Sequence, residues 1–145
     1  MSARPLPRPR SDFRHFAGIT TRWADNDVYG HVNNVTYYAF FDTAVNGFLV
    51  ANGLLDPERS PVIGLVVETA CAYFAPIAFP TPVEIGLVVA ELGRRSMRYE
   101  LGVFAAGATT TAAHGRFTHV MVDRVTRRPV PIPPEWRQVL ERIRA

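Results

Sequence analysis

The sequence predicts a single α+β domain in which one long helix packs against an antiparallel sheet. Its 145 residues are the usual size of one domain with one hydrophobic core. Apolar residues recur at helical spacing between residues 34 and 52, and four later segments have the composition of strands. Because the breaks between these segments are short, the strands are most simply antiparallel neighbours.

The first predicted strand covers residues 12 to 23, where aromatic and β-branched residues roughly alternate with others. A polar, turn-rich segment follows at residues 24 to 34. We expect the helix to begin at Asn33 or Asn34, with asparagine as the N-cap, and to stop at Gly53. Because apolar residues occupy two stripes, the rest of the domain should enclose this helix. The stripes are Tyr37, Phe40, Phe41, Ala44 and Phe48, and Val35, Tyr38, Ala39, Asp42, Val45 and Leu49.

The rest of the chain predicts a sheet, a second helix and a tail. Apolar residues at i, i+3, i+4 and i+7 predict a short amphipathic helix within residues 133 to 145. Residues 1 to 11 alternate proline with arginine and are expected to be a disordered tail, which leaves residues 12 to 145 as a single domain. The four later strands are predicted at residues 62 to 76, 83 to 92, 96 to 105 and 110 to 125.

All 16 basic residues are arginine, and with 13 acidic residues they give a formal net charge of +3. Arginine favours phosphate and carboxylate partners, although a codon bias would produce the same composition. The arginines are dispersed and no nucleic-acid-binding motif interleaves them with aromatic residues. We therefore do not expect a nucleic acid as the partner.

Composition also limits the class of protein. Hydrophobic residues make up 48% of the chain and charged residues 20%, which excludes a mainly disordered protein. No uninterrupted apolar run is long enough to predict a membrane span. Cys71 is the only cysteine, so neither an intrachain disulfide nor a cysteine-based zinc cluster is expected. The four histidines are scattered along the chain, so we expect no metal site. A single cysteine, which cannot form an intrachain disulfide, predicts a cytoplasmic location.

Polar residues crowd the segment that leads into the long helix. Asp25 and Asp27 are followed by Gly30-His31-Val32-Asn33-Asn34. The start of a helix offers unpaired backbone N–H groups that can bind an oxyanion or polarise a carbonyl oxygen. An upstream carboxylate can act on the same carbonyl carbon as nucleophile or as base toward water. An aspartate on its own in such a segment is more often a turn or capping residue. The interpretation as an active site therefore depends on how many polar residues gather in this segment.

The motif extends over residues 23 to 38, which read Trp-Ala-Asp-Asn-Asp-Val-Tyr-Gly-His-Val-Asn-Asn-Val-Thr-Tyr-Tyr. This segment resembles the Asp-x-Asp-x-x-Gly-His-Val-Asn-Asn-x-x-Tyr signature of hotdog-fold acyl-CoA thioesterases of the 4-hydroxybenzoyl-CoA thioesterase type. The resemblance implies a long central helix wrapped by an antiparallel sheet of about five strands. It also implies a homodimer with two active sites at the subunit interface, in some relatives assembled further into a homotetramer.

The resemblance implies roles for the motif residues. Asp27 corresponds to the catalytic carboxylate, and the backbone N–H of Asn34 to the donor that binds the thioester carbonyl. Gly30 and His31 correspond to the turn that brings these two groups together. Asp25 corresponds to a structural residue.

A sister group of thioesterases places its catalytic carboxylate on the long helix, which keeps Asp42 as a second candidate. The stripe that contains Asp42 predicts that its side chain is partly buried and paired.

The predicted substrate is an acyl-CoA, so CoA is part of the substrate and no separate cofactor is expected. Arg94, Arg95 and Ser96 resemble the turn that lies near the nucleotide in relatives, and we expect them to contact its phosphates. Arg127 and Arg128 form a second basic pair, for which a solvated hairpin tip is the simpler interpretation. Apolar residues of the helix and strands should line the acyl pocket, with Tyr37, Phe41 and Phe74 as candidates.

Two alternatives remain open beside a thioester hydrolase. A non-catalytic acyl-CoA-binding module on the same fold would not need Asp27. A hotdog dehydratase or hydratase would need an acid/base pair, commonly with histidine, that the sequence does not reveal. The acyl group, the pathway, the role of Asp27 as nucleophile or base, and a dimer or a tetramer also remain open.

Overall fold

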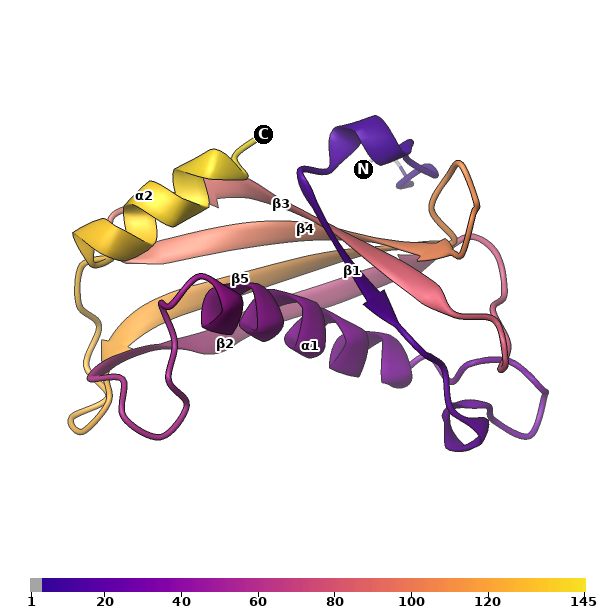
Figure 1. The fold of residues 1–145 in the computed structure, drawn as a ribbon, viewed down its shortest axis with the longest axis horizontal. Helices are drawn as coiled ribbons and strands as arrows, with labels where there is room; N and C mark the ends of the chain where they lie inside the picture. Colours follow the sequence, from indigo (N-terminus) through magenta and orange to yellow (C-terminus); the bar gives the residue numbers. More distant parts are fainter. Residues whose placement is uncertain (1–3) are drawn as a thin grey trace.

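The computed structural model describes residues 4–145 and contains one five-stranded sheet and two α-helices in that part of the chain (Figure 1). Two short 3-10 helices also occur, η1 (Arg10–Asp12) and η2 (Trp23–Asp25). In chain order the main elements are β1 (His15–Ile19), α1 (Thr36–Ala51), β2 (Val62–Tyr73), β3 (Val83–Leu92), β4 (Ser96–Ala105), β5 (Ala113–Asp123) and α2 (Pro134–Arg142).

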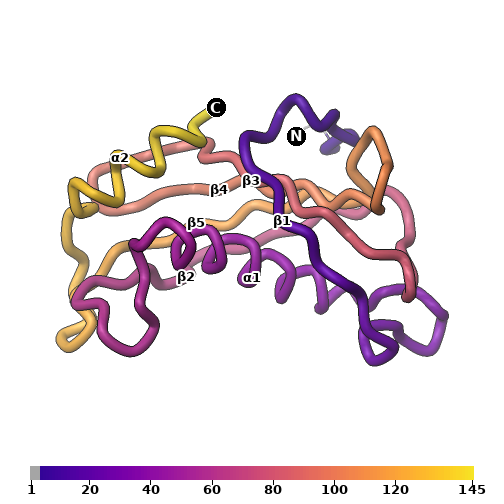
Figure 2. Tube along the Cα trace, viewed as in Figure 1, coloured from indigo at the N-terminus to yellow at the C-terminus, as the bar shows by residue number. Residues whose placement is uncertain are grey.

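The sheet is antiparallel throughout, with the strand order β1-β3-β4-β5-β2. The strands arch over α1, which lies along one face of the sheet, whereas α2 lies beside the end of β3 (Figures 1 and 2). The Val89 N–H donates to Ile143 O and so ties β3 to the end of α2. The predicted α+β arrangement of a long helix, five antiparallel strands and a short C-terminal helix is therefore confirmed.

One close contact of α1 with the sheet requires a glycine. Phe41 is fully buried, and its ring lies so close to Gly115 of β5 that a Cβ atom there would overlap it. At the other end of the helix, Gly53 has a φ of 71°, and its N–H donates to Val50 O. This left-handed residue ends the helix, as the sequence predicted.

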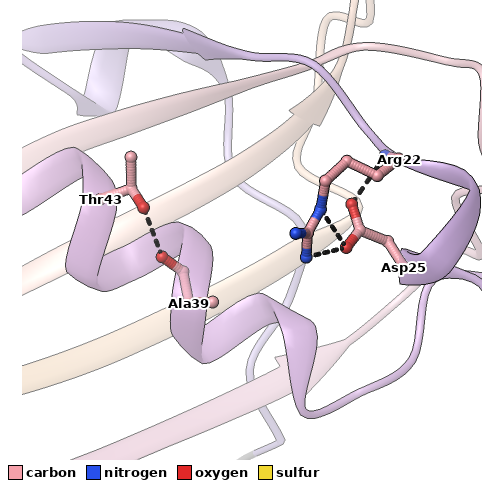
Figure 3. Close-up of polar contacts among 4 residues, drawn as sticks. All are labelled: Arg22, Asp25, Ala39 and Thr43. Atoms are coloured by element: carbon pink, nitrogen blue, oxygen red, sulfur yellow. Dashed lines mark hydrogen bonds and ion pairs between the residues drawn. The ribbon is translucent and has the colours of Figure 1, made fainter.

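The helix is not enclosed on all sides. Asp42 and Thr43 lie on a face that this chain leaves exposed, and the Thr43 hydroxyl donates to Ala39 O at 2.9 Å (Figure 3). Among the residues described, Asp42 has no basic partner, so the prediction that it is paired was wrong, although burial raises the pKa of its carboxyl. The sheet covers only one side of α1, and Asp42 points away from the stripe that Phe41 and Val45 bury.

The N-terminal segment departs from the expected disordered tail. The N–H of Arg8 donates to Thr111 Oγ1, and Thr111 N–H donates to Arg8 O. Arg10 pairs with Glu84 at 2.8 Å and stacks on the ring of Phe104. These contacts come from distant parts of the chain, which local composition does not reveal. The expectation for residues 1–3 lies outside the described residues.

Phe13 anchors this segment on the face of the sheet opposite α1. Gly86 and Gly102 are paired neighbours on β3 and β4, and Cβ atoms there would lie 2.7 and 2.6 Å from the Phe13 ring. The two glycines therefore form the seat for the ring. The strand expected from residue 12 begins only at His15, since Asp12 belongs to η1.

No α-helix in residues 4–145 is long and apolar enough to cross a membrane. In the same range, no cluster of three or more histidine, cysteine or acidic side chains is arranged to hold a metal ion.

Candidate active site

The loop between β1 and α1 folds back on itself around Asp27. The N–H of Asp27 donates to His31 O at 2.9 Å, and the N–H of Gly30 donates to Asp27 O at 3.1 Å. Gly30 has a φ of 83°, which side-chain-bearing residues rarely adopt, so this reversal of the loop favours a glycine. The Asp27 carboxylate accepts one hydrogen bond from the N–H of Tyr29 at 2.9 Å.

Asp25 has a different environment although it is only two residues away. Its side chain is 2% exposed and accepts bonds from the Arg22 guanidinium at 2.7 and 3.1 Å and from the Arg22 N–H at 2.8 Å (Figure 3). Burial acts to raise the pKa of Asp25, but the hydrogen bonds and the charge of Arg22 outweigh it and lower the pKa. Because its backbone O also accepts from the N–H of Asn33, Asp25 ties the loop to the start of α1.

Hydrogen bonds to Asn33 shape the turn into α1. The N–H of Thr36 donates to Asn33 O at 2.9 Å, and the N–H of Val35 donates to Asn33 Oδ1 at 3.0 Å. Val35 rather than an asparagine occupies the N-cap position, so the predicted cap was wrong: Asn33 bonds the turn before the helix instead. In the described part of the chain, the N–H of Asn34 has no hydrogen-bond acceptor.

A cavity of about 370 Å³ lies at this turn. Of the residues proposed from sequence, Asp27, Asn34, Tyr37 and Phe74 line it together. Burial, with a smaller contribution from Cys71, raises the pKa of Tyr37 to about 12, so its hydroxyl is neutral at physiological pH. The remaining lining residues are Val32, Tyr73, Ala75 and Pro76. A carboxylate, an unpaired N–H and aromatic rings thus share one cavity.

Three other proposed residues lie outside this lining. Gly30 and His31 are exposed and shape the loop through their backbone. Phe41 lies in the core against Gly115. Sequence reasoning missed Tyr73, whose hydroxyl donates to Asn34 O at 2.9 Å. The available signal was its position next to Phe74, at the end of the same predicted strand.

The basic turn proposed for CoA lies elsewhere. Arg94 and Arg95 lie in the turn between β3 and β4, and Ser96 begins β4, at the opposite end of the sheet from the loop after β1 (Figure 1). Arg94 and Arg95 are exposed, and Ser96 lines a separate cavity of about 680 Å³. A single chain therefore does not bring these residues to the Asp27 cavity.

Arg127 and Arg128 lie at an exposed hairpin tip. Asp123 Oδ1 accepts from the N–H groups of Val125 and Thr126 at 2.9 and 2.8 Å, and Arg127 N–H donates to Asp123 O. These backbone bonds lower the pKa of Asp123. The turn is organised by this aspartate, and neither arginine side chain lines any of the cavities described above.

A helix wrapped by a five-stranded antiparallel sheet, with a carboxylate and a free N–H at the start of the helix, defines a domain of the hotdog class. The chain belongs to the thioesterase-like superfamily, which it matches over residues 21–140. This membership supports thioester hydrolysis as the general activity. None of the curated proteins compared with the chain matches it in sequence.

Solved structures agree with this assignment. The PA5185 protein from Pseudomonas aeruginosa is 54% identical, with a TM-score of 0.94 over 97% of this chain and 98% of that one. The PA2801 protein from Pseudomonas aeruginosa is 27% identical, with a TM-score of 0.81 over 88% of this chain and 98% of that one. The BH1999 gentisyl-coenzyme A thioesterase is 25% identical, with a TM-score of 0.78 over 87% and 99%.

Proposed function

We propose that the protein hydrolyses an acyl-CoA thioester to a free acid and CoA, as the resemblance to the 4-hydroxybenzoyl-CoA thioesterase type implies. The observation that carries this proposal is that Asp27 lines the same cavity as Asn34, whose backbone N–H has no acceptor in the described structure. A thioester carbonyl whose oxygen accepts from that N–H exposes its carbon to the carboxylate. Losing one such donor typically raises the barrier by about 3 kcal/mol.

Two routes use this arrangement. In the first, an Asp27 oxygen bonds to the carbonyl carbon, the carbon–sulfur bond breaks, CoA leaves as a thiolate, and water then cleaves the resulting anhydride. In the second, Asp27 accepts a proton from water as the water adds to the carbon, and that proton then goes to the leaving thiolate. In both routes the Asn34 N–H stabilises the negative charge that develops on the carbonyl oxygen.

CoA recognition requires a second copy of the chain in this proposal. Arg94, Arg95 and Ser96 would contact the nucleotide phosphates of a substrate bound at the partner's Asp27 cavity, because they lie far from the cavity of their own chain. The exposed apolar residues of edge strand β2 support a homodimer or homotetramer, since an uncovered strand edge pairs readily with another chain. These residues are Leu65, Val66 and Val67.

The assembly and the phosphate contacts are tested separately. Size-exclusion chromatography with light scattering should give a molecular mass twice or four times the 16.2 kDa of one chain. Arg94→Ala and Arg95→Ala should raise the KM for CoA esters more than the KM for a thioester that lacks the nucleotide. Equal effects on both substrates would argue against the phosphate contacts.

The activity itself is tested with aliphatic and aromatic acyl-CoA esters, assayed for release of free thiol. The wild type should cleave at least one class, and Asp27→Asn should not. Asp42→Asn is the matched control, since it makes the same change on the exposed face of α1. If Asp42→Asn is inactive and Asp27→Asn is active, the carboxylate on the helix has the catalytic role.

A non-catalytic acyl-CoA-binding module is the alternative, and the same panel distinguishes it. Binding of acyl-CoA esters without thiol release by the wild type would favour that module. A cytoplasmic location, expected from the cysteine usage, is in keeping with a CoA ester as substrate.

A further inference from the structure

We propose that Tyr73 is a positioning residue for the oxyanion donor, holding the backbone of Asn34 through a hydrogen bond from the end of β2. This inference rests on the proposed function of the Asn34 N–H. The Tyr73 hydroxyl donates to Asn34 O at 2.9 Å across 39 positions of the chain. It is the tether that connects the sheet to the turn from which the donor projects.

The turn is held one peptide unit at a time. The unit that joins Asn33 to Asn34 carries the free N–H, and its carbonyl, Asn33 O, accepts from the N–H of Thr36. The next unit joins Asn34 to Val35: its N–H donates to Asn33 Oδ1, and its carbonyl accepts from Tyr73. Of these three bonds, the one from Tyr73 comes from outside residues 33–36 and ties the turn to β2, whereas the bond from Asn33 N–H to Asp25 O ties the turn to the preceding loop.

Tyr73 is itself held in place. Its backbone pairs with Ala113 of β5, and its ring packs edge-on against Tyr37 at a centroid distance of 5.0 Å and an interplanar angle of 88°. Burial, then Cys71 and Tyr38, raise the pKa of Tyr73, so its hydroxyl remains a proton donor through the neutral range. In the described part of the chain, no other side chain donates to Asn34 O.

Tyr73→Phe removes the hydroxyl and keeps the ring that lines the cavity. We expect kcat to fall roughly tenfold, as misplacement of a catalytic group does, while KM changes less than about twofold. The shape of the pH profile of kcat should not change, because a tether takes no part in proton transfer. Tyr99→Phe is the matched control: it removes a buried hydroxyl that has no partner in the described structure, and kcat should equal that of the wild type.

Several outcomes would overturn the inference. Wild-type kcat in Tyr73→Phe, or a raised KM with unchanged kcat, would mean that the hydroxyl does not position the donor. Equal losses in Tyr73→Phe and Tyr99→Phe would indicate a general effect of removing hydroxyl groups. A changed pH profile would make Tyr73 a participant in proton transfer instead.

A second variant keeps the test decisive if Tyr73→Phe unfolds. Asn33→Ala removes the acceptor of the Val35 N–H, at the other end of the peptide unit whose carbonyl Tyr73 holds, and should also lower kcat at constant KM. Asn33→Asp retains the acceptor oxygen and should restore kcat to the wild-type value. Wild-type kcat in Asn33→Ala would contradict the positioning of the turn. If Asp27→Asn is inactive while these variants are fully active, only the positioning role fails, whereas an inactive wild type would end both proposals.

Discussion

Two of the places in residues 4–145 where polar groups lack hydrogen-bond partners differ in their surroundings. At the start of α1, the free N–H of Asn34 belongs to a residue that lines a cavity of about 370 Å³ together with Asp27. Between β4 and β5, the Tyr99 hydroxyl and His119 Nε2 also lack partners, but both side chains are enclosed in the core, 0% and 2% exposed. An unpaired polar group thus suggests a binding site only where a ligand can reach it.

The fold tolerates the unpaired Tyr99 hydroxyl and His119 Nε2 in its core because neither group is charged. The Tyr99 and His119 rings pack edge to face with centroids 5.4 Å apart, so they behave largely as aromatic core residues. Burial lowers the pKa of His119 to about 4 and raises that of Tyr99, so both are neutral at physiological pH. The unmade hydrogen bonds lower stability and have no counterpart in the proposed chemistry.

The largest expected effect separates activity from stability at the first region. Asp27→Asn should lower kcat about a thousandfold, as expected for loss of an acid/base group. The free energy of unfolding should change by less than about 0.5 kcal/mol, because an asparagine oxygen can still accept from the Tyr29 N–H. Thiol release and urea unfolding measure the two quantities, and a large loss of stability would remove the contrast between the two regions.

The next effect concerns His119 and acid. In the unfolded chain His119 binds a proton below about pH 6.5, whereas in the folded chain burial delays protonation until about pH 4. The neutral His119 therefore contributes its full stabilisation of the fold above about pH 6.5, and this stabilisation is lost on acidification. The wild type should lose about 3 kcal/mol from this residue between pH 7 and pH 4. Urea unfolding of His119→Leu should show a correspondingly smaller loss. The same pH dependence in both proteins would refute a neutral buried histidine.

The smallest effect tests Asp25, the neighbour that is fully paired. Asp25→Asn should lower the free energy of unfolding by about 1–2 kcal/mol at pH 7, since Arg22 is 74% exposed and solvent screens the ion pair. Because the folded pKa of Asp25 is lowered, this difference should be constant above about pH 5 and narrow as the pH falls below about 4. A kcat loss as large as that of Asp27→Asn would show that the two aspartates are not separated in role.

The fold could be predicted because its signals are local. Helical periodicity located α1, and β3 and β4 have the predicted bounds. The errors depend on long-range contacts. Arg8 and Arg10 look disordered until Thr111 and Glu84 are placed beside them. The exposure of Asp42 follows from which side of α1 the sheet covers, and periodicity alone does not determine that.

The cavity shows the same division. Asp27, Asn34 and Tyr37 lie within a few residues of one another, so a contiguous motif was sufficient to propose them. Tyr73 reaches Asn34 from a strand 39 positions away, and nothing local to either residue indicates the contact. Phe41 and Phe74 are both candidates for the acyl pocket from sequence, yet Phe41 lies in the core and Phe74 at the cavity.

The strand order has a consequence for the emergence of the chain from the ribosome. Strands β3, β4 and β5 pair with their neighbours in sequence, but β1 must wait for β3, and β2 for β5. Helix α1 appears early and packs against Gly115, which is among the last residues of the sheet to be made. Until β5 has been synthesised, the edge of β2 has no partner strand and Phe41 lacks its contact with Gly115, so the nascent chain exposes apolar surface that favours aggregation.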